Sequence, residues 1–552
     1  MAYRLLLLVL LLRLLAPTLT WAQLAAPVPP WSMTNLATEP AARAYAWPRA
    51  TAVDEAGNVF VVGMFHDTIT LGSHTLCSAG SQDFYLAKYV PATHTWAWAV
   101  RGGGLGSDDA RALAVHKGCV YLTGSLQNNY LDDNQVTLDG PQPVPQPGAV
   151  NAQPSLDMFV AKYFDHGTRA SLAWCQVAGG AGLDYGTSVA VREPNVYVTG
   201  TLSNDRHHRQ GAVFGSTGPL PGLYPQLGTL AGPGSDLVLA KYTDHGLSAT
   251  FGWSEVAGGT YSAVGHGVAV QGSSVYVVGD LESYHNLPAC VRMGGHGRVP
   301  GTTRLLVPGK RPIQSWLLAK YTDLGDHAAA GWSQVAGSDD GGTATAVAVR
   351  GGSVYVLGAM NNDRTHAMRV QVEGRRPLAI SCPARHYEGP LEVAAVLAKY
   401  TDHGTAGSFE WLRLDGTNDY YEGSSLVVRG PWVYTIGYSF FNRTHSRRGI
   451  AGGTPRPPGY AHRAEAPYDV KDRPYLAGYY DEGPRAALRW VRVFDYPYQM
   501  MSRHFGLGLC GPRLYVMGST WLPARFGRFT LGRPEQGLGF VVAGVEVGAA
   551  GQ

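Results

Sequence analysis

The chain has 552 residues, a formal net charge of +3, 15% charged residues, 71 glycines and 35 prolines. The small net charge argues against a dedicated nucleic-acid-binding protein, because such proteins gather positive charge on one face. Many glycines and prolines beside few charges are typical of short strands joined by turns rather than of helices.

The first segment, MAYRLLLLVLLLRLLAPTLTWAQ, predicts a secretory signal peptide over residues 1–22. An arginine, a leucine-rich core and small residues before Gln23 form the pattern of a cleaved signal. An uncleaved membrane anchor is the alternative, but Arg13 interrupts the apolar run and leaves it short for a bilayer. We therefore expect a secreted or cell-surface protein with no membrane span after cleavage.

Residues 23–552 are predicted to form one domain built from a repeat. Its first marker is the alanine of an LAKY-like segment, and four successive intervals between copies are 79 residues; the copies are Ala87, Ala161, Ala240, Ala319, Ala398, Ala477 and Ala543. The second marker is the glycine that ends a V-Y-x-x-G-like segment, at Gly63, Gly124, Gly200, Gly279, Gly358, Gly437 and Gly518. Two independent markers that each occur seven times predict seven units.

Each unit contains four strand-like runs in a fixed order. An AVAV-like run comes first, then the V-Y-x-x-G run, the LAKY run and a run that carries a tryptophan. The runs are apolar almost throughout, as in strands whose two faces are both covered by neighbouring sheets. The predicted fold is therefore all-β, a seven-bladed β-propeller of four-stranded antiparallel blades.

The two ends of the repeat fit together. The last LAKY-like run, FVVAGVEV at 540–547, has no tryptophan strand after it, whereas WSMTNLAT near the N-terminus begins with the unpartnered Trp31. The N-terminal strand is thus predicted to complete the last blade as its outer strand. This closure would cover an edge that otherwise invites aggregation.

The segments DMFVAKYFDHG, AWCQVAGG and ATAVDEAGNVFVVG resemble the SBBP-type (seven-bladed β-propeller) repeats of secreted bacterial proteins. The resemblance covers essentially everything after the signal peptide and implies the propeller fold. It implies no common activity, since one fold hosts many functions.

By similarity to related propellers, the four runs of each unit are strands A to D from the inside outward. The long connections then lie on one predicted face. The A–B and C–D turns are short, whereas B–C loops reach about 36 residues between Gly200 and Leu237, far above hairpin length. Long loops on a rigid frame often carry binding sites. In three B–C loops an arginine and a histidine recur, which indicates either anion-binding cations or simply a shared loop conformation; these pairs are Arg206/His208, Arg364/His366 and Arg443/His445.

The D–A loops on the same face combine carboxylates with aromatic rings. This pairing suits a sugar, because carboxylates accept hydroxyl hydrogen bonds and rings cover C–H faces. Alternatively, these aspartates form turns and the tyrosines pack between blades. The candidate ligand-binding residues are Asp108, Asp184, Tyr185, Tyr261, Asp339, Asp419, Tyr420, Tyr421 and Tyr496.

The favoured function is that of a secreted binding or interaction protein for an extracellular glycan or protein. A structural or adhesive scaffold is one alternative, and a polysaccharide hydrolase or lyase is another, which as a glycosidase would need two positioned carboxylates. No catalytic residue and no cofactor is predicted, and the six cysteines lack the C-x-x-C spacing of a zinc site. We expect a monomer. The Asp-His-Gly segments are predicted turns, and the LAKY lysines are predicted to pack between blades.

Overall fold

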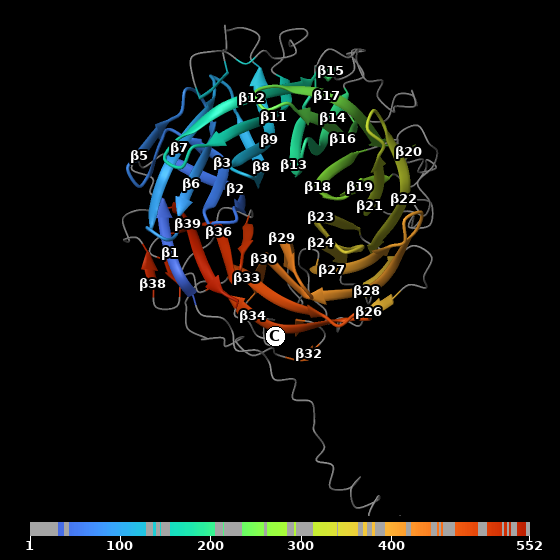
Figure 1. Cartoon of the computed structure of the whole chain (residues 1–552). Coiled ribbons are helices and arrows are strands. Elements are labelled where there is room, and N and C mark those ends of the chain that lie inside the picture. Colours follow the sequence, from blue (N-terminus) through green and yellow to red (C-terminus); the bar gives the residue numbers. More distant parts are fainter. Residues whose placement is uncertain are drawn as a thin grey trace, which may run out of the picture.

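The computed structural model describes residues 31–37, 44–128, 136–139, 144, 155–180, 182–204, 213–214, 234–258, 262–283, 292–293, 313–338, 341–362, 368–372, 378–380, 392–415, 421–442, 450–451, 454–455, 470–494, 505–521, 524–526, 529–531 and 538–547. These residues form strands and turns, with no helix among them. Seven antiparallel sheets stand around a common axis, which confirms the predicted seven-bladed propeller (Figure 1).

Each blade runs from strand A beside the axis to strand D at the rim. Blade 1 is β2 (Tyr45–Val53), β3 (Val59–His66), β6 (Asp83–Val90) and β7 (Thr95–Gly103). Blade 2 is β8 (Asp109–His116), β9 (Cys119–Asn128), β11 (Ser155–Asp165) and β12 (Ala170–Gly179). Blade 3 is β13 (Tyr185–Arg192), β14 (Asn195–Asn204), β16 (Gly234–Asp244) and β17 (Ala249–Gly258).

The remaining blades repeat this order. Blade 4 is β18 (Ala263–Gln271), β19 (Ser274–Ser283), β21 (Ile313–Asp323) and β22 (Ala328–Ser338). Blade 5 is β23 (Gly342–Arg350), β24 (Ser353–Asn362), β27 (Glu392–Asp402) and β28 (Gly407–Asp415). Blade 6 is β29 (Tyr421–Arg429), β30 (Trp432–Asn442), β33 (Val470–Asp481) and β34 (Ala486–Val493). Blade 7 is β35 (Gly506–Cys510), β36 (Arg513–Trp521), β39 (Leu538–Glu546) and β1 (Trp31–Ala37).

Blade 7 takes its outer strand from the other end of the chain. β1 pairs antiparallel with β39, from Trp31 opposite Val545 to Ala37 opposite Phe540. The predicted ring closure is thus confirmed. Backbone hydrogen bonds that would otherwise be open along β39 are satisfied by a segment about 500 residues away in the sequence.

The B–C connections contribute further short strands. β10 (Thr137–Leu138), β15 (Val213–Phe214), β20 (Arg292–Met293) and β25 (Met368–Val372) pair with the outer strands of blades 1, 2, 3 and 4. Each therefore extends the preceding blade by a fifth strand, which covers part of its edge. The other short strands form local pairs, β25 with β26 (Leu378–Ile380), β4 (Thr68–Leu71) with β5 (His74–Cys77), β31 (Ile450–Ala451) with β32 (Thr454–Pro455), and β37 (Ala524–Phe526) with β38 (Phe529–Leu531).

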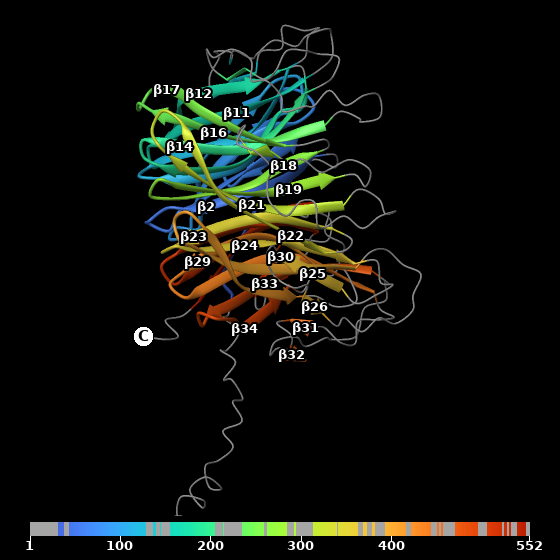
Figure 2. The same cartoon turned by 90° about the vertical axis from the view of Figure 1, so that its right-hand side faces the viewer.

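The hydrophobic core lies between blades. Strands B and C are buried over almost their whole length, as in β3, where the residues from Val59 to Phe65 are all buried. Seven apolar clusters fill the seven spaces between neighbouring blades. This is why the strand runs show little polar–apolar alternation. Figure 2 shows the propeller from the side, where each blade packs against the next. No helix among the described residues has the length and apolar character to cross a membrane.

The C–D hairpin tips join neighbouring blades through an aspartate. Asp244 at the end of β16 accepts hydrogen bonds from Lys162 Nζ (2.6 Å), Tyr121 Oη (2.7 Å) and Trp174 Nε1 (3.0 Å), all in blade 2. The same oxygens hold the turn, because Asp244 Oδ1 also accepts from the amide of Gly246, whose φ is +91°. The sequence repeats this arrangement, and the interblade aspartates are Asp165, Asp244, Asp323, Asp402 and Asp481.

Candidate functional site

A β-bulge interrupts strand A at the same place in blade after blade. In β8, for example, Ala110 and Ala112 pair with consecutive residues of β9, and Arg111 is left unpaired between them. The same shift occurs in β2, β13, β18, β23 and β29. A bulge releases one residue from the ladder and re-aims its side chain.

The V-Y-x-x-G signature explains this bulge. A Cβ atom on Gly124 would lie 1.9 Å from the carbonyl oxygen of Asp109, which turns toward strand B where the bulge begins. The corresponding distance at Gly200 is 2.1 Å to Tyr185, and at Gly279 it is 2.0 Å to Val264. Any side chain would collide with the bulged backbone, so the repeated glycine is a packing requirement of this inner strand.

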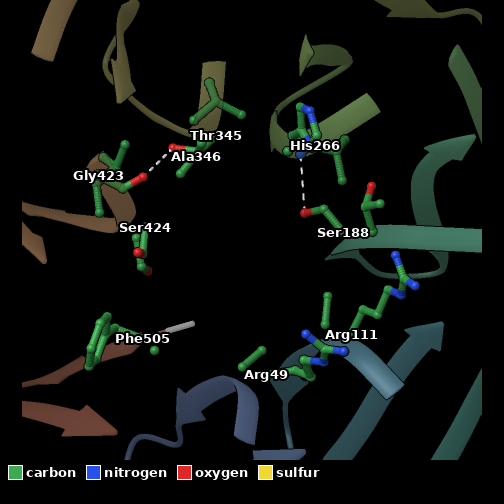
Figure 3. A pocket seen from close by; sticks show the side chains of 18 of the residues that line it. Arg49, Arg111, Ser188, His266, Thr345, Ala346, Gly423, Ser424 and Phe505 are labelled. Atoms are coloured by element: carbon green, nitrogen blue, oxygen red, sulfur yellow. Dashed lines mark hydrogen bonds between the residues drawn. The ribbon is translucent and has the colours of Figure 1, made fainter. Parts of the chain in front are cut away.

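The released residues form a ring around the axis. In β35 the corresponding residue is Phe505, just before the strand, so that the seven positions are Arg49, Arg111, Thr187, His266, Thr345, Ser424 and Phe505. Together with neighbouring strand A residues they line a cavity of about 570 Å³. Figure 3 shows the labelled side chains distributed around this space.

One side of the cavity carries two arginines that share a carboxylate. Arg49 binds Asp109 through both ends of its guanidinium, Nε at 3.2 Å from Oδ1 and Nη2 at 3.0 Å from Oδ2. Arg111 Nε lies 3.2 Å from Oδ2 of the same Asp109, which is only 5% exposed. The guanidinium carbon of Arg111 also lies 4.3 Å from the centre of the Tyr185 ring, in a cation–π contact.

Threonine hydroxyls line two further positions of the ring. Thr187 Oγ1 donates to the carbonyl of Gly265 at 2.6 Å or of Thr199 at 3.1 Å, and Thr345 Oγ1 lies similarly near Gly423 O at 2.8 Å. A hydroxyl has one proton and two lone pairs. Since the proton is used inside the protein, these oxygens can offer a ligand only acceptor lone pairs.

Blade 4 contributes a histidine–aspartate pair to the cavity lining. His266 Nε2 lies 2.8 Å from Asp280 Oδ2, which also accepts a hydrogen bond from Thr343 Oγ1 at 2.9 Å. The second oxygen of Asp280 accepts from the amide of Ala344 at 3.2 Å. Asp280 is thereby fixed in position across the cavity from the arginines.

Two of the predicted carboxylates are buried in the D–A loops. Asp108, which is 0% exposed, accepts hydrogen bonds from the amides of Gly104 and Gln127 at 2.8 and 2.9 Å. Asp184, which is 1% exposed, accepts in the same way from Gly180 and Ser203 at 2.9 and 2.8 Å. Burial raises the pKa of each carboxyl to about 7. The structure therefore uses both carboxylates to hold their loops, and we leave them out of the candidate site.

Tyr185 is the predicted residue that the structure brings to the cavity, where its ring supports Arg111. Tyr421 begins β29 opposite Ser439, and its side chain lies outside the described part. Tyr261, Asp339, Asp419, Tyr420 and Tyr496 lie outside the described residues, as do the three arginine–histidine pairs of the B–C loops. The predicted loop site as a whole thus stays a prediction.

Sequence reasoning did not find the ring of bulge residues, although a signal exists. From blade 2 to blade 7 each ring residue lies 13 positions before the signature glycine, as Arg111 lies before Gly124. In blade 1 the interval from Arg49 to Gly63 is 14. Counting back from the glycine picks out this column, but only the bulge shows that it faces the axis. Among the described residues no group of three or more His, Cys, Asp or Glu side chains is placed to hold a metal ion.

Comparison with known proteins gives no family. No protein-family model matches the chain, and no curated protein matches it. Among solved structures it is similar to the phage phi92 endosialidase, at 10% identity and a TM-score of 0.36, over 94% of this chain and 70% of that one. It is also similar to the quinohemoprotein alcohol dehydrogenase from Comamonas testosteroni, at 10% identity and a TM-score of 0.32, over 94% of this chain and 77% of that one. Likenesses at this level carry no argument about function.

Proposed function

We propose that this propeller is an extracellular binding protein that holds a hydroxyl-rich ligand, a glycan above all, in its central cavity. The observation that carries the proposal is the ring of released side chains around a space of about 570 Å³. Ligand-binding pockets commonly enclose roughly 300–1,000 Å³. A propeller needs no polar ring for closure, since its stability comes from the contacts between blades.

The chemistry of the lining favours a ligand with many O–H groups. Thr187 and Thr345 present acceptor lone pairs, which match donors on the ligand. On another part of the lining, the Tyr185 ring presents a flat apolar face and the arginines present N–H donors. Sugars supply both hydroxyl donors and hydroxyl acceptors around one ring, and so they satisfy both kinds of wall at once.

The test is a glycan array with residues 23–552, followed by calorimetric titration of the glycans that bind. Tyr185→Ala should weaken binding roughly tenfold, because one cavity wall is lost and Arg111 loses its support. Leu247→Ala is the matched control, since Leu247 is 76% exposed on a C–D tip at the opposite face. An array with no binding, or equal loss from both substitutions, would contradict the cavity proposal. A loss from Tyr420→Ala with Tyr421→Ala, but not from Tyr185→Ala, would return the site to the D–A loops.

The remaining parts of the proposal have their own tests. Export through cleavage after Ala22 predicts that the secreted protein begins at Gln23, which N-terminal sequencing would show. Kinship with the SBBP-type repeats is part of the same proposal and is supported by the repeat segments. The alternative of a polysaccharide hydrolase requires a second carboxylate beside Asp280, and shortened oligosaccharides after incubation would reveal it.

A further inference from the structure

The arginine side of the cavity brings two positive charges to one carboxylate. Arg49 and Arg111 together carry two charges, and the carboxylate that both contact is the single Asp109. Asp280, the acidic residue in the described lining, lies with His266 on the other side. A guanidinium such as that of Arg111, in a cavity partly shielded from water, attracts a group of opposite charge.

The two arginines differ in what they leave open. Asp109 occupies both Nε and Nη2 of Arg49, whose side chain is 16% exposed. Asp109 Oδ2 lies 3.2 Å from Nε of Arg111, but this buried Nε makes no hydrogen bond within the described ranges, and neither do the terminal nitrogens of the side chain, which is 32% exposed. The charge contact with Asp109 and the cation–π contact with the Tyr185 ring hold this guanidinium in place. Two parallel N–H groups held in one plane are the geometry that binds a carboxylate through both of its oxygens.

The opposite side limits how much negative charge the ligand can carry. Asp280 is 8% exposed and keeps its position through His266, Thr343 and the Ala344 amide. A second anionic group placed there would meet a fixed carboxylate, and like charges at close range repel. Figure 3 shows His266 across the cavity from Arg49, with Ser188 between His266 and Arg111. The cavity is therefore suited to a ligand with an acid at one end and hydroxyl donors at the other.

We propose that the ligand of this cavity is an acidic sugar, a uronic acid unit whose single carboxylate binds the terminal nitrogens of Arg111. The inference rests on the proposed function, since it names the class of glycan that the same cavity holds. Arg49 and Asp109 position Arg111, and the threonine oxygens accept hydrogen bonds from the sugar hydroxyls. No covalent step is involved.

Calorimetric titration of residues 23–552 tests the proposal with four probes. These are oligomers of galacturonate and of glucuronate, and the neutral oligomers of galactose and glucose. The uronates should bind roughly 10- to 100-fold more tightly than their neutral counterparts, as expected for hydrogen bonds between ionised groups. Added salt should weaken uronate binding and leave neutral binding nearly unchanged.

Arg111→Gln removes the charge while keeping a planar donor. It should abolish the preference for uronates, because uronate affinity falls much further than neutral affinity. An unchanged urea unfolding midpoint shows that the variant is still folded. Arg111→Lys keeps the charge but lacks the two parallel N–H groups, and so it should retain part of the preference for uronates. Arg485→Gln is the matched control, because it removes one charge from a 65% exposed side chain outside the cavity.

Each outcome decides between the two proposals. Equal affinity for acidic and neutral oligomers would overturn the uronate inference and leave glycan binding intact. An equal fall in acidic and neutral affinity in Arg111→Gln would also overturn it, because the charge of the arginine would then not select the ligand. If a sulfated galactose oligomer binds better than the galacturonate, the group that Arg111 binds is a sulfate ester, and the uronate inference is wrong. If neither acidic nor neutral oligomers bind, glycan binding itself falls.

Discussion

The junctions between blades are of two kinds. Five of them, from blades 1 and 2 to blades 5 and 6, contain an interblade aspartate bound to a lysine of the preceding blade, with N–O distances of 2.5 to 2.7 Å. The two closure junctions, where blade 7 meets blades 6 and 1, contain no such pair among their described residues. They consist mainly of apolar contacts, such as the stacked rings of Tyr85 and Phe540 at 5.6 Å.

The two partners of the ionic pair appear and disappear together. The lysine position of strand C is Gly478 in blade 6 and Gly544 in blade 7. Three residues after strand C's lysine position, the aspartate position is Val547 in blade 7 and Pro91 in blade 1. The lysine is therefore missing wherever the next blade lacks the aspartate.

Burial explains this pairing. Lys241 and Asp323, for example, have side chains only 4% and 6% exposed, and a buried charge without its partner is strongly unfavourable. At Gly478 the space is used differently, because a Cβ atom there would lie 2.4 Å from Trp490 Cε2. The ring therefore has five junctions with buried ion pairs and a closure that depends on apolar packing and on β1.

Removal of β1 should have the largest effect on this ring. Deletion of residues 1–37 leaves the edge of β39 unpaired and opens the ring at its apolar closure. We expect a loss comparable with the whole stability of a domain, about 5–15 kcal/mol, and therefore an aggregated or unfolded product. Deletion of residues 1–30 is the control, since it keeps β1. Solubility and urea unfolding compare the two proteins, and equal stability would show that β1 does not hold the ring.

Loss of one interblade aspartate should come next. Asp323→Ala removes the acceptor of Tyr197, Lys241 and Trp253 at the junction of blades 3 and 4. We expect the free energy of unfolding to fall by about 3–5 kcal/mol, because Lys241 is left buried and unpaired. Asp326→Ala in the same hairpin is the control, with a side chain 89% exposed.

A double variant separates the charge from the packing. Asp323→Ala with Lys241→Met removes both ions, as in the closure junctions, and it should recover part of the lost stability. No recovery would mean that the hydrogen bonds to Tyr197 and Trp253, rather than the buried charge, carry the junction.

The repeat markers in the sequence were enough to predict the fold. Seven copies of V-Y-x-x-G and of the LAKY run predict the blades, because each copy is a local sequence pattern. The closure was predicted because the last LAKY-like run has no tryptophan strand after it and Trp31 has no such run before it. The lysine–aspartate pair was harder to see. Lys162 and Asp244 are 82 residues apart and belong to different blades, so only their co-occurrence along the chain links them.

The candidate site depended on details that periodicity does not give. Arg111 faces the cavity because a β-bulge shifts the register by one residue, and a shift of one residue reverses the direction of a side chain. The aspartates of the D–A loops showed the opposite problem. Asp108 and Asp184 fit a sugar-binding pattern, yet their oxygens bind the loop amides, a role that the composition of a glycine-rich loop suggests equally well.

Acid should weaken the junctions that contain an interblade aspartate more than the closure junctions. This effect on stability should be smaller than those of deleting β1 or of removing an interblade aspartate. Burial alone raises the pKa of Asp402, but hydrogen bonds from Lys320, Tyr276 and Trp332 outweigh it and lower the pKa to about 2. Asp244, Asp323 and Asp481 also have lowered pKa values, with burial again opposed by their hydrogen-bond donors.

A carboxyl whose pKa is lower in the folded than in the unfolded protein stabilises the fold above the unfolded pKa, and this contribution is lost as the pH falls through the folded value. The pKa of Asp402 falls from its model-peptide value of 3.8 to about 2, which corresponds to about 2 kcal/mol of stability. Urea unfolding from about pH 5 down to about pH 2 should therefore show a falling stability, with a shallower slope in Asp402→Asn than in the control Glu410→Gln, which removes an exposed carboxylate of the same blade. Val547 and Pro91 carry no such group, so hydrogen exchange in acid should rise first at the junctions of Asp244, Asp323, Asp402 and Asp481 and later around blade 7. If exchange rises first around blade 7, the apolar closure is the weaker part of the ring, and the ion pairs add less than their burial indicates.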